Sequence, residues 1–143
     1  MARTEYTGTA YIGVVGPNHE YGVCRDSINN IVRQAGDAYP RFGRATKGYE
    51  ARQIHLEDWY TQTQHEYLLL LDHDMVFAPD TLERLRAHRL PFVSGYYMRR
   101  QSNPIAPVWL APQQAGAWPF VPWTVDPERG KLHKLGASGW GCI

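Results

Sequence analysis

Cysteine is scarce in this sequence, and neither sign of charge is in excess. The 143 residues include 2 cysteines, Cys24 and Cys142, which are too few and too far apart for a disulfide framework or a zinc-knuckle spacing. We therefore expect two free or buried thiols. Lys and Arg number 15 against 14 Asp and Glu, so no global field attracts nucleic acid or an anionic membrane surface. Any anionic ligand must be held by local groups.

Long hydrophobic runs, a secretory leader and internal repeats are also missing. No segment approaches the roughly 20 apolar residues of a membrane span. The N-terminus lacks the cleavage pattern of a signal peptide. These absences predict a cytoplasmic protein without a membrane span. The length, with 43% hydrophobic and 20% charged residues, predicts a single domain over residues 1–143.

The first part of the chain has the pattern of an α/β unit. Residues 11–15 form a short apolar run before a Gly-Pro-Asn turn, which predicts a buried strand. Apolar residues then recur with helical spacing from Ile28 to Ala35, and Gly36 provides a stop. Strand, loop and helix in this order indicate an α/β protein.

A second strand and helix follow in the middle of the chain. The polar, glycine-rich residues 36–48 predict a loop or a poor strand. A helix is expected from Glu50 onward, because Leu56 and Trp59 have helical spacing. Residues 66–71 end in a continuous apolar run, which is typical of a central strand covered on both faces.

A third helix and a further strand follow, and the chain then changes character. Asp80 and Glu83 have capping-box spacing, so a helix is expected to begin at about Thr81. Residues 91–98 have the composition of a further strand. Proline and tryptophan are concentrated in residues 103–127, which predicts a loop-rich part with short extended pieces at most.

Two carboxylates and an imidazole directly follow the most hydrophobic run. Asp72, His73 and Asp74 come after the predicted strand at 66–71. Capping a helix or forming a turn is the usual role of an aspartate, but Asp80 already holds the cap position of the next helix. Alternation along an extended segment would place Asp72 and Asp74 on one side, roughly 6 to 7 Å apart, with His73 on the other.

Such a carboxylate pair predicts a metal–diphosphate site. Two carboxylates at this separation repel each other unless a cation or bound protons intervene. Mn²⁺ and Mg²⁺ prefer oxygen ligands and keep positions open for substrate phosphates. Open α/β sheets also bind their ligands at the carboxyl ends of the strands. We therefore expect Asp72 and Asp74 to hold Mn²⁺ or Mg²⁺.

These residues carry a resemblance to a known family. Residues 68–85 resemble the Asp-X-Asp strand end of GT-A-fold glycosyltransferases, particularly the family-two-like group, including the Pro-Asp-Thr-Leu helix start. Residues 48–53 are similar to the family's Ala-Arg-Asn element, with Gln53 in place of Asn. Residues 93–97 resemble the strand that follows, and residues 139–141 resemble the Gly-X-Gly of the acceptor side.

The resemblance implies both a fold and an activity. The fold would be the α/β GT-A fold, a Rossmann-like open sheet with flanking helices. Residues 1–100 would bind the nucleotide sugar, and residues 101–143 would form a loop-rich acceptor side. The activity would be metal-dependent transfer of a hexose-like sugar from a UDP- or GDP-sugar to a sugar or other hydroxyl acceptor.

The resemblance also implies roles for individual residues. Asp74 would hold the metal, and Asp72 would contact the ribose or the metal through water. His73 either lines the donor pocket or packs. The implied donor-binding residues are Val15, Gly16, Pro17, Lys47, Arg52, Asp72, His73 and Asp74. The implied acceptor-side residues are Gly139, Trp140 and Gly141.

The basic donor residues have a second interpretation as solvated surface cations. Lys47 and Arg52 lie upstream of the acidic motif, where either could pair with a phosphate. Arg52 has the stronger case, because its guanidinium can bind phosphate in bidentate fashion and because it matches the arginine of the Ala-Arg-Asn element.

The chain departs from the family pattern at two places. Residues 36–48 contain a single acid, Asp37, where the family reads the base. The family's general base belongs to a later acidic motif, which would lie beyond Ile143, and neither Asp126 nor Glu128 sits in a matching motif. We therefore assign no catalytic base. We expect either a C-terminally truncated chain or an open sheet edge that a partner, such as a second copy in a homo-oligomer, covers.

Two alternatives to the glycosyltransferase remain open. One is a nucleotidyltransferase of similar fold, although no glycine-rich basic signature follows the first strand. The other is a non-catalytic nucleotide-sugar-binding module or fragment, which the missing base motif would explain.

Overall fold

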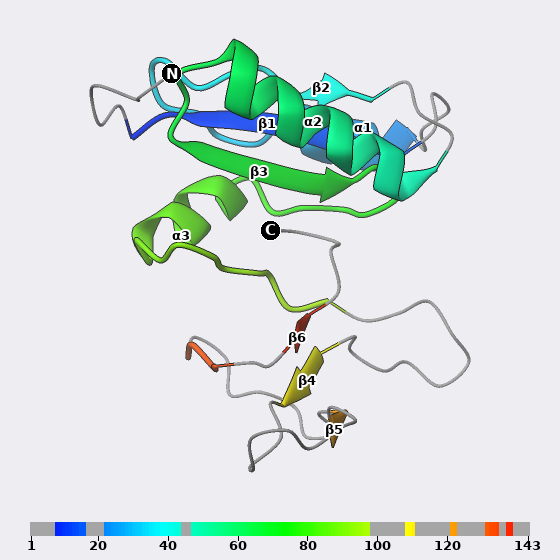
Figure 1. The fold of residues 1–143 in the computed structure, drawn as a ribbon, viewed down its shortest axis with the longest axis vertical. Helices are drawn as coiled ribbons and strands as arrows, with labels where there is room; N and C mark the ends of the chain where they lie inside the picture. Colours follow the sequence, from blue (N-terminus) through cyan, green and yellow to red (C-terminus); the bar gives the residue numbers. More distant parts are fainter. Residues whose placement is uncertain are drawn as a thin grey trace. The chain divides into compact units, whose positions relative to one another are not determined.

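The computed structural model describes residues 8–16, 22–43, 47–97, 108–110, 121–122, 131–134 and 137–138 (Figure 1). The chain divides into two compact units, Met1–Gly95 with Trp140–Ile143, and Tyr96–Gly139. The larger unit contains a parallel sheet and three helices, and the smaller unit contains a short antiparallel sheet.

The parallel sheet consists of β1 (Ala10–Val15), β2 (Arg41–Phe42) and β3 (Tyr67–Asp72), in the order β2-β1-β3. β1 pairs in parallel with both neighbours, and its register with β3 joins Ala10 to Tyr67 and Val15 to Asp72. Parallel neighbours require crossover connections, which the helices provide. This open sheet with flanking helices confirms the predicted α/β class.

The helices are α1 (Gly22–Asn29), α2 (Gly48–Gln62) and α3 (Thr81–Ala87). Alternate residues of β1 and β3 point to opposite faces of the sheet, so each face has its own core. Ile12 and Leu71 belong to the larger core, which also contains Ile28 of α1 and Leu82 of α3. α2 covers the other face (Figure 1), where Ala51 packs with Val15 and Leu70.

A buried histidine joins α2 to β1. The Nε2 atom of His55 lies 3.0 Å from the Val14 carbonyl oxygen, and its Nδ1 atom lies 3.1 Å from the Tyr11 hydroxyl. A Cβ atom at Gly13 would lie 2.6 Å from the His55 ring, so only glycine allows this close approach. Burial lowers the pKa of His55, which favours the neutral imidazole.

The helix predicted from Ile28 to Ala35 is wrong beyond its first residues, because α1 ends at Asn29. The segment that follows instead contains Asp37, whose carboxylate is fully buried. Asp37 accepts hydrogen bonds from the backbone N–H groups of Ala10 (2.8 Å) and Gln34 (2.9 Å). It also pairs with Arg86 at 2.7 Å. The long-range bonds to Ala10 and Arg86 outweigh the helical periodicity of the segment.

The other expected strands are confirmed in part. Within residues 36–43 and 47–48, which the structure describes, the two-residue β2 is the only strand, as the prediction of a loop or poor strand requires. The strand predicted over residues 91–98 is wrong for residues 91–97, which form none; Met98 lies outside the described residues. Within the described ranges β3 is therefore an edge strand, where a central strand was predicted, and β1 takes the centre.

α3 begins at Thr81, as predicted, but without the capping box. The Asp80 side chain makes no cap hydrogen bond. Its carboxylate lies 4.0 Å from Arg84 instead, and Glu83 lies 3.7 Å from Arg86. Pairing along the helix surface thus replaces the reciprocal cap.

The smaller unit contains β4 (Val108–Leu110), β5 (Val121–Pro122) and β6 (Ala137–Ser138), which pair antiparallel in the order β5-β4-β6. These short strands agree with the prediction of brief extended pieces in a loop-rich part. Among the described residues of both units, no helix has the length and apolar character to cross a membrane.

Candidate functional site

The carboxyl ends of β1 and β3 meet at one edge of the sheet. The register pairs Val15 with Asp72, so the residues that follow each strand emerge together. α2 begins at the same edge, since a Cβ atom added at Gly48 would lie 2.9 Å from Arg52 Nη1 and 3.9 Å from Val15 Cγ1. The parallel topology thus gathers residues that are far apart in the sequence.

An ion pair lies at this edge, at the end of β3. The Nη2 atom of Arg52 lies 2.7 Å from Oδ1 of Asp72, and the two side chains are 23% and 26% exposed. Burial raises the pKa of Asp72, the Arg52 guanidinium opposes this rise, and the Asp74 carboxylate adds to it. The acidic pair is therefore close enough to interact. Arg52 pairs with Asp72, and its expected role toward a phosphate stays a prediction.

The acidic motif does not continue as a strand. β3 ends at Asp72, and residues 73–74 form a turn, so the predicted extended alternation through Asp74 is wrong. His73 bonds back to β1 instead. Its backbone N–H donates to the Val15 carbonyl at 2.9 Å, and its Nδ1 lies 3.1 Å from the same oxygen. Backbone pairing with β1 therefore bends the chain after the strand.

Gly16 allows His73 to pack at the end of β1. A Cβ atom at Gly16 would overlap the His73 imidazole, and the φ angle of Gly16 is +150°. Both observations require glycine at this position. His73 therefore packs against the end of β1, and its place in a donor pocket stays a prediction.

Lys47 lies at the same edge but engages its own helix. It is the N-cap residue of α2, with an extended backbone and no side-chain cap hydrogen bond. Its Nζ atom lies 3.3 Å from the Tyr49 hydroxyl and 3.7 Å from Glu50 Oε1, and its side chain is 62% exposed. Pro17, Gly139, Trp140 and Gly141 lie outside the described residues.

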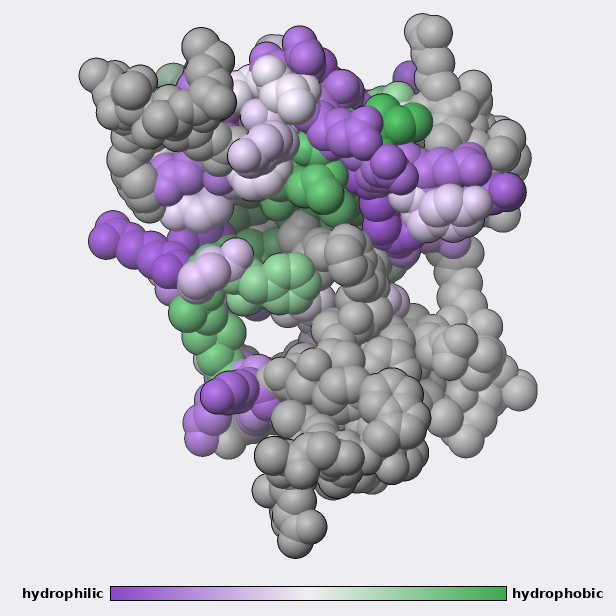
Figure 2. Space-filling view, in the orientation of Figure 1, coloured by the Kyte–Doolittle hydropathy of each residue, from purple (hydrophilic) through white to green (hydrophobic). Residues whose placement is uncertain are grey.

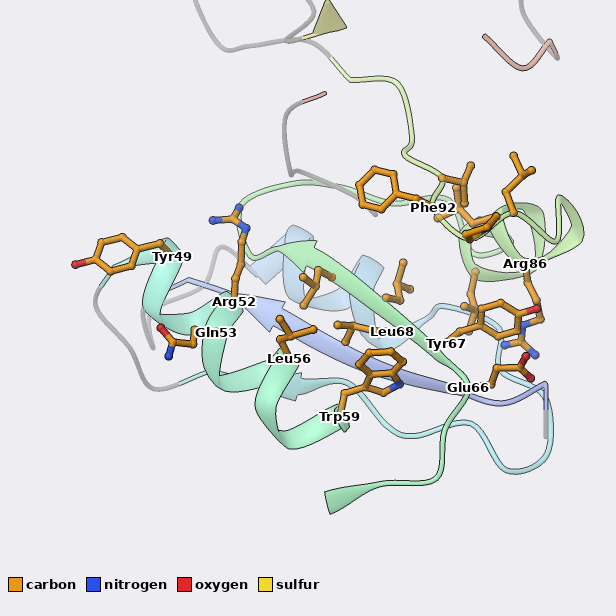
Figure 3. Close-up of a pocket in the computed structure, with 17 residues that line it drawn as sticks. Tyr49, Arg52, Gln53, Leu56, Trp59, Glu66, Tyr67, Leu68, Arg86 and Phe92 are labelled. Carbon is orange, nitrogen blue, oxygen red and sulfur yellow. The ribbon is translucent and has the colours of Figure 1, made fainter. Parts of the chain in front are cut away.

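The sequence did not predict a groove that extends from Arg52 along β3 (Figure 3). Its volume is about 710 Å³, and its wall includes Leu56 and Trp59 of α2. Arg52 marks its end at the tip of β3, and Glu66 and Arg86 mark the other end. The exposed apolar residues of α2 were the available signal, but periodicity alone assigned them to a helix face.

No described group of three or more His, Cys, Asp and Glu side chains is placed to hold a metal ion. The chemistry available at the edge is that of two neighbouring carboxylates, a guanidinium and a helix N-terminus. Carboxylates can bind a cation, and the other two groups favour anions.

Comparison of the chain with protein families, curated proteins and solved structures finds no match. A functional proposal therefore rests on the chemistry of the chain's own residues and on the resemblance of residues 68–85 to the Asp-X-Asp strand end.

Proposed function

We propose that the protein is a divalent-cation-dependent glycosyltransferase of the GT-A fold, which transfers a sugar from a UDP- or GDP-sugar to a hydroxyl acceptor. The observation that carries this proposal is the position of Asp72 and Asp74 at the carboxyl end of a parallel strand, with Arg52 2.7 Å from Asp72. This is the edge at which open α/β sheets bind ligands.

Asp72 and Asp74 would hold Mn²⁺ or Mg²⁺ between them. The two residues suit such an ion, because the Asp74 carboxylate adds to the rise that burial causes in the pKa of Asp72. A cation bound between the two carboxylates would lower this pKa again. Phosphate oxygens and water commonly supply the rest of the shell. When bound, the cation would offset the negative charge that develops on the departing diphosphate.

Arg52 and the start of α2 would bind the diphosphate. Arg52 can leave Asp72 for a phosphate when the carboxylate gains a cation, because each charge then keeps a partner of opposite sign. The 15-residue helix α2 begins beside Val15 and Arg52, and its N-terminus favours an anion. Gly16 and His73 would border the nucleoside, and residues 139–141 the acceptor.

Turnover of nucleotide sugars tests this proposal. Wild-type protein with Mn²⁺ is expected to release free sugar and nucleoside diphosphate slowly from either a UDP- or a GDP-sugar, and EDTA should stop the release. Asp74→Asn should reduce the rate at least tenfold, because it removes one metal-binding carboxylate. Asp80→Asn is the matched control, since Asp80 is 62% exposed at the start of α3.

Other outcomes of this assay, and of a parallel assay with a nucleoside triphosphate and a sugar phosphate, would replace the proposal. Metal-dependent binding without release of sugar would replace the enzyme with a non-catalytic nucleotide-sugar-binding module. Release of pyrophosphate from a nucleoside triphosphate and a sugar phosphate would indicate a nucleotidyltransferase. Equal rates for Asp74→Asn and Asp80→Asn would show that the acidic pair has no part in the reaction.

A further inference from the structure

The ion pair at the end of β3 is short and largely buried. The Nη2 atom of Arg52 lies 2.7 Å from Oδ1 of Asp72, and the two side chains are 23% and 26% exposed. Lys47 and Glu50, at the start of α2, are 3.7 Å apart and 62% and 42% exposed. Partly buried pairs are screened less by water and salt than exposed ones. Arg52 and Asp72 therefore attract each other more strongly than the surface pair.

The first turn of α2 positions the guanidinium of Arg52. A Cβ atom at Gly48 would lie 2.9 Å from Arg52 Nη1, so glycine leaves room for the side chain beside this turn. Long helical side chains point in this direction, toward the N-terminus of their helix. Anions are favoured at a helix N-terminus and beside a guanidinium. The anion that Arg52 binds in this structure is a carboxylate of the chain itself, that of Asp72.

Apolar surface beside the pair reduces the screening further. Arg52 lines one end of the groove, and the wall of the groove includes Leu56 and Leu68 (Figure 3). Figure 2 shows hydrophobic surface between α2 and β3. Apolar surroundings strengthen the attraction within the pair, and they equally strengthen the repulsion between Arg52 and a second positive charge.

We propose that the Arg52–Asp72 ion pair is a lock, which weakens the binding of a cation until a diphosphate binds with it. This inference rests on the proposed function and adds the regulation of the same site. While the pair is intact, the charge of Arg52 opposes a cation at Asp72, and the charge of Asp72 opposes a phosphate at Arg52. A cation and a diphosphate that bind together relieve both conflicts, because each takes one partner of the pair. Each ligand should therefore raise the affinity of the other.

Removing the guanidinium tests the effect of the lock on the cation. Arg52→Gln keeps a polar side chain but removes the charge, so it should bind Mn²⁺ without nucleotide about tenfold more tightly than wild type. Arg52→Lys keeps the charge and should bind Mn²⁺ as weakly as wild type. Arg84→Gln is the matched control and should have no effect, since Arg84 lies 4.0 Å from Asp80 on the exposed surface of α3. Electron paramagnetic resonance measures the free Mn²⁺ in each titration.

Removing the carboxylate tests the effect of the lock on the diphosphate. Asp72→Asn should release Arg52, so that UDP or GDP binds in EDTA about tenfold more tightly than to wild type. Asp74→Asn removes the same charge but leaves the partner of Arg52 in place, and should gain less. Asp80→Asn, in the exposed pair on α3, should gain nothing. Isothermal titration measures these affinities, and circular dichroism spectra would confirm that each variant is folded.

The outcomes separate the lock from the proposed function. If wild type binds Mn²⁺ together with UDP or GDP, but Arg52→Gln binds Mn²⁺ alone no more tightly than wild type, the lock is wrong and the proposed function stands. Equal gains for Asp72→Asn and Asp74→Asn would also overturn the lock, and this comparison does not require Arg52→Gln to fold. A wild type that binds neither UDP nor GDP in the presence of Mn²⁺ would overturn both.

Discussion

Gly16 fixes the shape of the candidate site at the residue scale. Its φ angle of +150° is one that L side chains rarely adopt, and its missing side chain leaves room for the His73 imidazole. His73 in turn bonds to the Val15 carbonyl, which ties the turn after β3 to the end of β1. The sequence indicated a turn near Gly16, but its contact with a residue 57 positions later depends on the strand register.

Replacing Gly16 by alanine is expected to lower the free energy of unfolding by about 1–3 kcal/mol, because the backbone is strained and the new Cβ meets His73. Urea denaturation measures the change. Gly22→Ala is the control, since nothing lies within 4 Å of a Cβ at that first residue of α1. The control should be neutral or slightly stabilising. Equal losses in the two variants would contradict the role of Gly16.

His55 is expected to make stability depend on pH. Burial lowers its pKa below the usual 6.5, despite the opposing hydrogen bond to Val14. The unfolded chain therefore binds a proton more readily, so stability is highest above pH 6.5 and falls as the pH drops toward the folded pKa. The slope should be at most about 1.4 kcal/mol per pH unit.

Urea denaturation at several pH values measures this slope for wild type and His55→Gln. The variant should show a flatter profile below pH 6.5, because glutamine does not titrate. Parallel profiles would mean that other groups cause the dependence.

At the scale of secondary-structure elements, a buried ion pair holds α3 to the start of β1. Arg86 of α3 is 11% exposed, and its partner Asp37 is fully buried and bonded to the Ala10 N–H. Removing one partner of a buried pair leaves an uncompensated charge, which is strongly destabilising.

Arg86→Ala should therefore lower the free energy of unfolding by about 3–5 kcal/mol. Arg84→Ala, in the same helix with a 70% exposed side chain, should change it by less than about 0.5 kcal/mol. Thermal and urea unfolding compare the two variants. A loss below about 1 kcal/mol for Arg86→Ala would contradict a structural role for the pair.

The elements that the sequence predicted well are those with strong local signals. The apolar runs of β1 and β3 and the start of α3 lie where their patterns indicate. The end of α1 and the missing strand at residues 91–97 depend on distant contacts, which no local pattern contains. In α2, Leu56 and Tyr60 have helical apolar spacing, but their side chains are 50% and 74% exposed. The buried residues of this helix are Ala51 and His55.

At the scale of the whole molecule, the parallel topology brings Gly16, Arg52 and Asp72 to one edge. This convergence followed from the general rule that strand ends share an edge in an α/β sheet. The Arg52–Asp72 pair and the groove beside it were not predictable, because both depend on side-chain positions across elements. In the proposed function, the pair would exchange partners when a cation and a diphosphate bind together.

Metal-linked binding of nucleoside diphosphates is the most direct test of this account. Isothermal titration of UDP and GDP would be performed with Mn²⁺ and with EDTA, for wild type, Asp74→Asn and Asp80→Asn. We expect wild type and Asp80→Asn to bind one of the nucleotides at least tenfold more tightly with Mn²⁺, and Asp74→Asn to lose this difference. Affinity that is independent of Mn²⁺ in wild type, or a full Mn²⁺ effect in Asp74→Asn, would contradict a cation site at the end of β3.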